Sequence, residues 1–162
     1  MANCMKQHLV GLFVLLFTIF TGGLAQAETA LTVGPASGGA ETTFTIEELL
    51  KLDQVEIVTA NEFVDGKRVF SGPLIRDVLD ISHANGAQHI RITAANDYQI
   101  EIDVEEFHKY DVILALSMDG VALSRRDKGP IWLIYPMSDF VELQDPVFNN
   151  RLIWQVVKVE YW

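Results

Sequence analysis

The sequence predicts a single α+β domain in which a mixed, curved sheet is combined with short helices. Segments whose apolar residues alternate with polar ones, the pattern of a half-buried strand, outnumber segments with helical spacing. Turn-forming Gly, Asp, Asn and Pro residues separate these segments at short intervals, and no repeat, heptad or low-complexity tract is found. Short helices scattered among about eight strands are typical of the α+β class.

The first 27 residues have the features of a secretory signal peptide. Lys6 gives a short basic start, the run from Leu9 to Phe20 is apolar, and Ala25-Gln26-Ala27 is a small-residue cleavage site. The apolar run is shorter than the roughly 20 residues that a membrane-spanning helix needs. We therefore expect residues 1–27 to be removed and the remaining chain to be exported.

The composition limits the classes of function. The chain has 12 Lys and Arg against 22 Asp and Glu, a net charge of −10, and loss of Lys6 would make it −11. Nucleic-acid binding and attachment to an anionic membrane surface both need a dense cationic face, so neither is expected. The only cysteine, Cys4, lies in the signal peptide. The mature domain would therefore have no disulfide, no thiolate nucleophile and no Cys-ligated metal.

The start of the mature chain is predicted to be a flexible lead. Residues 28–42 are rich in Gly, Ala, Ser and Thr, with one short apolar stretch from Leu31 to Val33. A short edge strand at that stretch is the alternative. The domain proper is expected to cover residues 43–162.

Two short helices and a hairpin are predicted next. Thr45 and Glu48 form a capping box ahead of apolar residues at helical spacing. Asp65-Gly66 is typical of a hairpin turn and has β-forming residues on both sides. Gly72-Pro73 then opens a second helix, since a proline in the first turn loses no hydrogen bond, and Asn85-Gly86 ends it.

The second half of the chain is predicted to be mainly strand. Residues 90–94 and 98–104 alternate between apolar and polar. A helical turn at 105–110 precedes the apolar run 112–118, which is typical of a central strand. The remaining segments are an Asp-Gly turn at 119–120, a buried strand at 131–135, an irregular segment at 137–150 of a length that often carries function, and a final strand at 152–161.

The motifs of common catalytic centres are absent from the sequence. It contains no G-x-S-x-G, no P-loop, no G-x-G-x-x-G and no H-E-x-x-H. His83, His89 and His108 lack the spacing of zinc ligands, and nothing selects a catalytic pair among the 22 acidic residues. No catalytic residue and no metal ligand are therefore predicted.

Three clusters remain as candidate binding residues. They are the basic Arg125, Arg126 and Lys128, the turn Asn96-Asp97-Tyr98, and the aromatic Trp132, Tyr135 and Trp154. The planar fork of arginine can hold an anionic group, but a salt-bridged surface turn is an alternative for the first cluster. An Asx turn accounts for the second without any ligand, and core packing is the commoner role of the third.

Five segments then occur in a characteristic order. They are FSGPLIRDVL (Phe70 to Leu79), ANDY (Ala95 to Tyr98), DGVAL (Asp119 to Leu123), KGPIWLIYP (Lys128 to Pro136) and NRLIWQV (Asn150 to Val156). Together they resemble the oxidoreductase molybdopterin-binding domain, which has the sulfite-oxidase fold. The resemblance covers about residues 43–161. It implies an α+β domain whose loops hold a pterin with its pyrimidine edge buried.

The chain departs from this family at the metal ligand. The resemblance implies a cysteine thiolate on molybdenum in the segment before Phe70, but that segment reads Val58-Thr59-Ala60-Asn61-Glu62, with Ala60 near the place of the thiolate. We therefore expect a pterin, reduced or molybdopterin-like, without molybdenum. Two alternatives stay open. One is a molybdopterin-dependent oxidoreductase, or its subunit, with the metal held only by the dithiolene; the other is a non-catalytic interaction module with a decayed pocket.

A pterin is flat and has a donor-rich pyrimidine edge, so it needs an acceptor for that edge and an aromatic ring for its face. Asp97 is expected to accept from the edge, an aromatic side chain to stack, and Arg126 or Arg151 to reach the polar tail. The predicted binding residues are Asn61, Asp97, Tyr98, Arg126, Lys128, Trp132, Tyr135, Arg151 and Trp154.

The chain is also similar to the small periplasmic pterin-binding proteins. The likeness rests on the short length, the signal peptide, the missing cysteine and the segments W-L-I-Y-P and I-W-Q. It implies a periplasmic protein that binds a reduced pterin. It also implies a partner, the periplasmic part of a membrane sensor that controls cyclic-di-GMP and, through it, biofilm formation.

Overall fold

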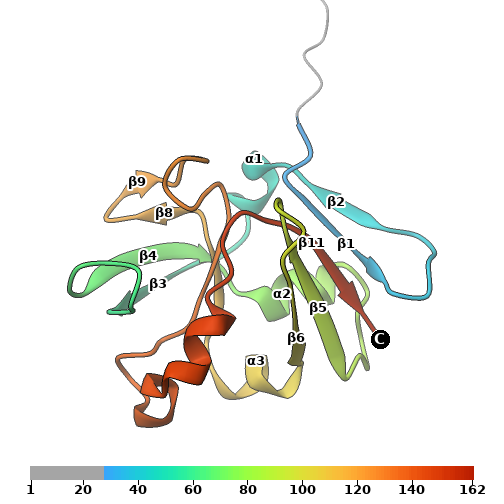
Figure 1. The fold of residues 1–162 in the computed structure, drawn as a ribbon. Coiled ribbons are helices and arrows are strands. Elements are labelled where there is room, and N and C mark those ends of the chain that lie inside the picture. The colour runs from blue at the N-terminus through green and yellow to red at the C-terminus, as the bar shows by residue number, and fades with distance from the viewer. Residues whose placement is uncertain (1–27) are drawn as a thin grey trace, which may run out of the picture.

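The computed structural model describes residues 28–162, so the predicted signal peptide lies outside the described residues. Figure 1 shows two main sheets with short helices between and below them. The larger sheet has the strand order β2-β1-β11-β5-β6. Its strands are β1 (Leu31–Pro35), β2 (Thr42–Phe44), β5 (His89–Ala94), β6 (Gln99–Asp103) and β11 (Val156–Tyr161). β1 and β11 are parallel and the other pairs are antiparallel, so this sheet is mixed, as predicted.

The prediction of a flexible lead over residues 28–42 is wrong at β1. This strand lies inside the sheet, between β2 and β11, and the side chains of Leu31 and Val33 are fully buried. The small residues of this segment suggested flexibility. The sequence around β1 does not show that β11, at the far end of the chain, pairs with it. The alternative of an edge strand at this stretch also fails, since β2 forms the edge.

The second sheet has four antiparallel strands in the order β3-β4-β8-β9. They are β3 (Gln54–Thr59), β4 (Arg68–Pro73), β8 (Ser117–Met118) and β9 (Val121–Ala122). β3 and β4 form a hairpin, but residues 60–67 join them as a loop, in place of the tight turn predicted at Asp65-Gly66. The predicted Asp119-Gly120 turn is confirmed, because φ is 51° at Asp119 and 76° at Gly120, both in the left-handed region that a type I′ turn requires.

A third pair of strands joins the two sheets. β7 (Ile113–Ala115) pairs with β10 (Trp132–Ile134) in antiparallel fashion. The last strand of the chain begins at Val156, later than predicted, because residues 152–155 bend around β10. There the N–H of Leu133 donates to the carbonyl of Ile153 at 2.9 Å.

The helices are short. α1 (Ile46–Leu49) has the predicted capping box, in which the N–H of Glu48 donates to Oγ1 of Thr45 at 3.2 Å and the N–H of Thr45 donates to Oε2 of Glu48 at 2.8 Å. α2 (Ile75–Ile81) and α3 (Glu105–Lys109) follow, and the segment predicted to be irregular contains the 3₁₀ helices η1 (Val141–Gln144) and η2 (Pro146–Arg151).

α2 starts later than predicted, because Gly72 and Pro73 belong to β4. A Cβ at Gly72 would lie 2.0 Å from the carbonyl oxygen of Leu114. The glycine therefore serves the close approach of β4 to β7 and does not begin a helix.

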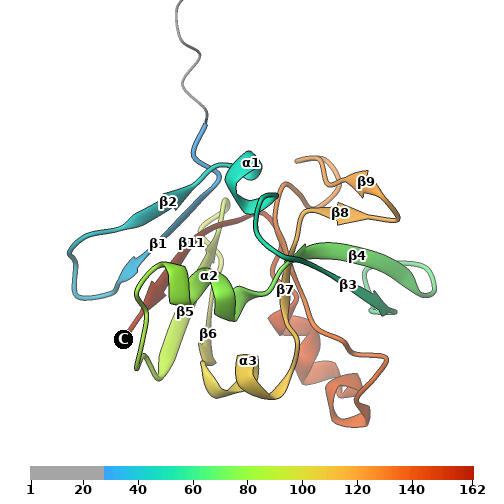
Figure 2. The ribbon, with the colours of Figure 1, turned by 180° about the vertical axis from the view of Figure 1, so that it is seen from behind.

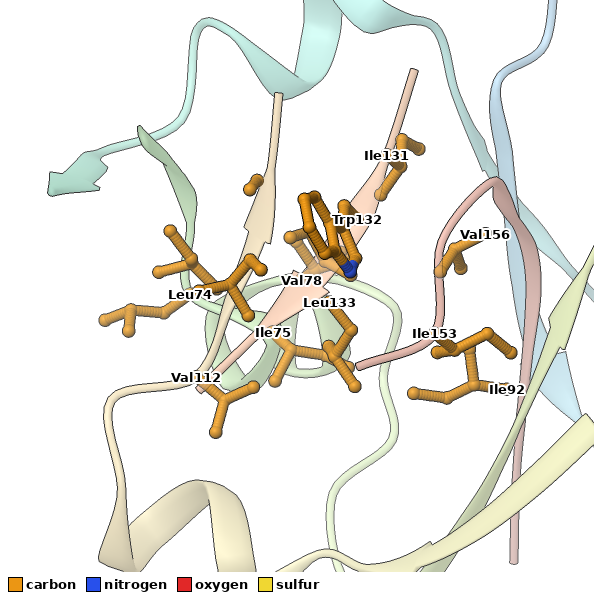
Figure 3. Close-up of a cluster of buried hydrophobic side chains, with 14 of the residues drawn as sticks. Leu74, Ile75, Val78, Ile92, Val112, Ile131, Trp132, Leu133, Ile153 and Val156 are labelled. Atoms are coloured by element: carbon orange, nitrogen blue, oxygen red, sulfur yellow. The ribbon is translucent and has the colours of Figure 1, made fainter. Parts of the chain in front are cut away.

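The core lies where α2 meets β7, β10 and the start of β11. Figure 2 shows α2 at the junction of the two sheets, and Figure 3 shows Ile75 and Val78 of α2 with Trp132 and Leu133 of β10. All four side chains are buried. Within residues 28–162, no helix is long and apolar enough to cross a membrane.

Candidate functional site

Two adjoining hollows lie where the β3–β4 loop, the β5–β6 turn and the segment around η2 meet. The first has a volume of about 250 Å³ and is lined by Phe63, Ala94, Asn96, Tyr98, Asn149, Asn150, Leu152, Ile153 and Trp154. The second, of about 520 Å³, is lined by Ala60, Asn61, Glu62, Lys67, Met137, Ser138, Leu143, Gln144 and Asn149. Asn149 lines both hollows, so we treat them together as the candidate site.

The aromatic wall of the candidate site is built on Trp154. Its side chain is 36% exposed, and the rings of Phe63 and Trp132 meet it nearly at right angles, with centroids 5.0 and 6.5 Å away. Such edge contacts hold an indole in one orientation. Tyr98, 48% exposed, lines the same hollow from the β5–β6 turn. The site therefore offers two partly exposed rings for a flat ligand.

The turn Asn96-Asp97-Tyr98 is an Asx turn, the alternative that its sequence allowed. Oδ1 of Asn96 accepts a hydrogen bond from the N–H of Tyr98 at 3.2 Å, and Asp97 takes a left-handed φ of 65°. Asn96 and Tyr98 line the hollow, but Asp97 does not. The contribution of Asp97 is to shape the turn, and the predicted contact between its carboxylate and the ligand edge is not supported.

The β3–β4 loop brings amide and backbone groups to the site. Oδ1 of Asn61 accepts from the N–H of Phe63 at 2.9 Å, while its Nδ2 is buried and has no hydrogen-bond partner among residues 28–162. The N–H of Ala60 donates to Oγ of Ser138 at 3.0 Å, and the N–H of Ser138 donates to Oγ1 of Thr59 at 3.0 Å. The loop is thus fixed, and one buried amide donor beside the second hollow has no partner within residues 28–162.

Trp132 and Tyr135, which were predicted as binding residues, do not line the candidate site. Both side chains are fully buried. Nε1 of Trp132 donates to the carbonyl of Leu152 at 3.0 Å, and the hydroxyl of Tyr135 donates to Oε2 of Glu106 at 3.0 Å. Burial, followed by the nearby charge of Glu106, raises the pKa of Tyr135 well above its ordinary value. A ring with no exposed face cannot stack on a ligand. Trp132 packs behind Phe63 and Trp154, whereas Tyr135 packs near Tyr110.

The predicted basic residues do not line the candidate site either. Arg151 donates to Oε1 of Glu106 at 2.7 Å and to the carbonyl of Glu101 at 2.8 Å, so its guanidinium joins η2 to α3. Nζ of Lys128 lies 5.2 Å from the ring centroid of Trp132, and Arg126 is exposed. Neither is among the lining residues. The loop at 124–129 thus faces another part of the surface.

Three of the nine predicted binding residues, Asn61, Tyr98 and Trp154, line the candidate site. Phe63, Asn149 and Asn150 line the site without having been singled out, and Asn96 belonged to a candidate cluster but not to the nine predicted residues. The Asn149-Asn150 pair carried a signal, because it ends the irregular segment whose length suggested a function.

The residues present fit a pterin ring better than a protein-ligated metal. Four asparagines line the hollows beside two partly exposed rings. Nδ2 of Asn149 donates to Oε2 of Glu62 at 2.7 Å, while the amide of Asn150 has no side-chain hydrogen bond within residues 28–162, so donors and acceptors remain for a pyrimidine edge. A molybdenum ion would need a coordinating side chain from the protein. Ala60, which lines the second hollow, has only a methyl group and cannot coordinate a metal. Residues 28–162 contain no cysteine and no group of three or more His, Cys, Asp or Glu side chains placed to hold a metal ion.

A family model described as the oxidoreductase molybdopterin binding domain matches residues 25–141. The chain belongs to this family. The matched residues include the β3–β4 loop and the β5–β6 turn of the candidate site, while Asn149 and Trp154 lie beyond them. A comparison with curated proteins finds no significant match.

The fold of this family is also seen in a similar solved structure, that of the sulfane dehydrogenase SoxCD from Paracoccus pantotrophus. The TM-score is 0.60 at 17% sequence identity, and the match covers 82% of this chain and 37% of that chain. The predicted sulfite-oxidase-like α+β fold is therefore confirmed. The chain spans little more than a third of the length of SoxCD, and at this identity the likeness concerns the fold alone.

Proposed function

We propose that this protein is a periplasmic pterin-binding protein that binds a reduced pterin without molybdenum in the candidate site. In this proposal the bound protein signals to the periplasmic part of a membrane sensor that regulates cyclic-di-GMP. The observation that carries the proposal is Ala60, which lines a site with partly exposed rings and asparagine amides, where the family resemblance implies a thiolate nearby. Export, the reduced state of the pterin and the sensor partner are supported by the resemblance to the small periplasmic pterin-binding proteins.

Binding would use the side chains that line the two hollows. Trp154 offers an indole already held by Phe63 and Trp132, so little side-chain entropy is lost when a ring stacks on it. Stacking of a nucleobase, the nearest analogue, on an aromatic side chain contributes about 1–3 kcal/mol. Asn61 offers a buried donor that only a ligand or a water molecule would satisfy.

The proposal is tested by titrating the protein with tetrahydrobiopterin under anaerobic conditions and measuring the heat of binding. We expect saturable binding, weakened roughly 5- to 100-fold by Trp154→Ala, which corresponds to the loss of about 1–3 kcal/mol of stacking. Trp162→Ala is the matched control, because Trp162 is also partly exposed but packs beside Arg91 and His89 at the other end of β5. Absence of heat would indicate a pocket that no longer binds pterin, and equal affinity in all three proteins would mean that pterin does not stack on Trp154.

The second candidate function is a molybdopterin oxidoreductase or a subunit of one. The family assignment favours it, because the dithiolene of the cofactor can hold the metal without a protein thiolate. Metal analysis of protein produced in a host that makes the cofactor separates the two. Molybdenum in a one-to-one ratio with the protein would replace our proposal with this candidate.

A further inference from the structure

The outer edge of β3 is free, and a groove runs beside it. β3 is the first strand of the four-stranded sheet and pairs only with β4, as Figure 1 shows. The groove has a volume of about 500 Å³. One wall is the strand from Val55 to Val58, and the other includes Lys109, Asp111, Pro136, Asp139 and Phe140.

The pairing of β4 determines which backbone groups of β3 point outward. The carbonyl of Val69 accepts from the N–H of Asp119 at 2.7 Å, and that of Ser71 accepts from the N–H of Leu116 at 2.8 Å. Backbone groups of successive residues point to opposite sides of a strand. Phe70 and Gly72 therefore direct their backbone groups toward β3.

The register of the hairpin shows which residues of β3 pair with β4. Ile57 lies opposite Phe70 and Val55 opposite Gly72, so Ile57 and Val55 use their backbone groups on β4. Glu56 and Val58 direct theirs to the free edge. Among residues 28–162, no hydrogen bond involves the backbone groups of these two residues, and the side chain of Val58 is 52% exposed. Such an edge is a template for another strand.

The chemistry of the groove selects a basic and aliphatic occupant. Pro136, Phe140 and Val58 give it apolar surface. The carboxylates of Glu56 and Asp139 have no ion-pair or hydrogen-bond partner within residues 28–162, whereas Lys109 is paired with Glu142 at 3.1 Å. With a net charge of −10 on the chain, the groove and the whole molecule attract cationic segments.

We propose that the edge of β3 binds an extended segment of a partner protein in which lysine or arginine alternates with aliphatic residues. The segment adds a fifth strand next to Gln54–Val58, and side chains at every second position meet the apolar and acidic surface of the groove. The added strand does not continue to Ala60, because the N–H of Ala60 already donates to Oγ of Ser138. The groove shares no lining residue with the candidate pterin site, so binding at this edge does not depend on the proposed function.

The test is a titration of the ¹⁵N-labelled protein, without pterin, with the peptide acetyl-Lys-Val-Lys-Val-Lys-Val-amide. We expect saturable changes in chemical shift and slower hydrogen exchange at the amides of Glu56 and Val58, and little change in exchange at Val55 and Ile57, whose N–H groups already donate to β4. The matched peptide with Glu in place of Lys is expected to bind at least tenfold more weakly. Changes centred elsewhere, or unaltered exchange at Glu56 and Val58, would overturn the proposal.

Two variants separate strand pairing from adhesion by charge. Val58→Pro removes an outward N–H without removing a bond to β4, and it is expected to weaken the Lys peptide at least tenfold, while Val58→Thr keeps the N–H and retains binding. Glu56→Lys reverses an exposed charge in the groove and provides a second test if Val58→Pro does not fold. It is also expected to weaken binding of the Lys peptide. Sedimentation without peptide checks for a second copy of the chain at this edge, and a dimer that protects the same amides would contradict a basic partner.

Discussion

At the scale of single residues, two tryptophans that lie opposite each other have different roles. Trp132 and Trp154 form an isolated β-bridge, yet Trp132 is fully buried and Trp154 is 36% exposed in the candidate site. Both were predicted to bind the ligand, because their motifs do not state which ring faces outward. The difference arises from position: Trp132 lies on β10 in the middle of the core, whereas Trp154 lies in the bend before β11.

Asp119 is a residue whose charge stabilises a turn. Its Oδ1 accepts from the N–H of Val69 at 3.0 Å and its Oδ2 from Nη1 of Arg68 at 3.0 Å. The backbone hydrogen bond first, and then Arg68, lower the pKa of Asp119 below its ordinary value. A carboxylate with a lowered pKa stabilises the fold above its unfolded pKa of about 4, and this stabilisation is lost as the pH falls through the folded value.

We therefore predict that Asp119→Asn has a lower Tm than the parent at pH 7 and that the difference shrinks at an acid pH below the lowered pKa of the parent carboxylate. Asparagine tolerates the left-handed φ of 51°, so the charge is the main change. Thermal denaturation at the two pH values measures the effect. Asp65→Asn, in the exposed loop of the other hairpin, is the control and should show no such dependence. An equal loss of Tm for Asp119→Asn at both pH values would show that its charge is not responsible.

At the scale of elements, the wall of the candidate site depends on the link between η2 and α3. Arg151 of η2 is joined to Glu106 of α3 at 2.7 Å, and Tyr135 donates to the same carboxylate. The side chains of Arg151 and Glu106 are 29% and 19% exposed. The predicted role of Arg151 as a ligand contact is thus replaced by a structural role, which holds the segment that carries Asn149 and Asn150.

We predict that Arg151→Met lowers the free energy of unfolding by about 1.5–3 kcal/mol, the contribution of hydrogen bonds to a charged group, since Glu106 keeps only Tyr135 as a side-chain partner. Arg91→Met is the matched control. Arg91 pairs with Glu101 at 2.7 Å on the surface, and exposed pairs contribute about 0–1 kcal/mol. Urea denaturation of both variants gives the comparison. Similar losses of unfolding free energy for the two variants would mean that the ion pair between η2 and α3 stabilises the fold no more than an exposed surface pair does.

At the scale of the whole molecule, the two ends of the described chain complete one sheet. β1 pairs in parallel with β11, so the first and last strands are neighbours. Leu31 and Val33 are buried there, and burial of an aliphatic side chain contributes about 1.5–3 kcal/mol. Since a domain of this size is stable by only about 5–15 kcal/mol, the segment once expected to be flexible carries a large part of the stability.

We predict that a protein beginning at Ser37, which lacks β1, is unfolded or has a Tm lower by more than about 10 °C. A protein beginning at Ala30 is the control and should melt like one beginning at Glu28. It loses only the exposed pair of Glu28 with Arg125, and such pairs contribute little. Melting followed by circular dichroism measures both. Equal Tm values for the two truncations would support the flexible lead after all.

The sequence by itself determined the family, the α+β class and the local structures whose signals lie within a few residues. The capping box of Thr45 and the Asp119-Gly120 turn are examples, because each depends on neighbouring side chains and on local φ and ψ. The positions of Asn61, Tyr98 and Trp154 beside the two hollows agree with their choice from segments in or near those that resemble the family.

Only the tertiary structure decided the pairing of β1 with β11, the burial of Trp132 and Tyr135, and the ion pair of Arg151 with Glu106. In each case the partner lies far away in the chain, and nothing in the local sequence carries its position. Exposure and pairing depend on which surfaces meet when the two sheets pack around α2, and that meeting also leaves the edge of β3 free.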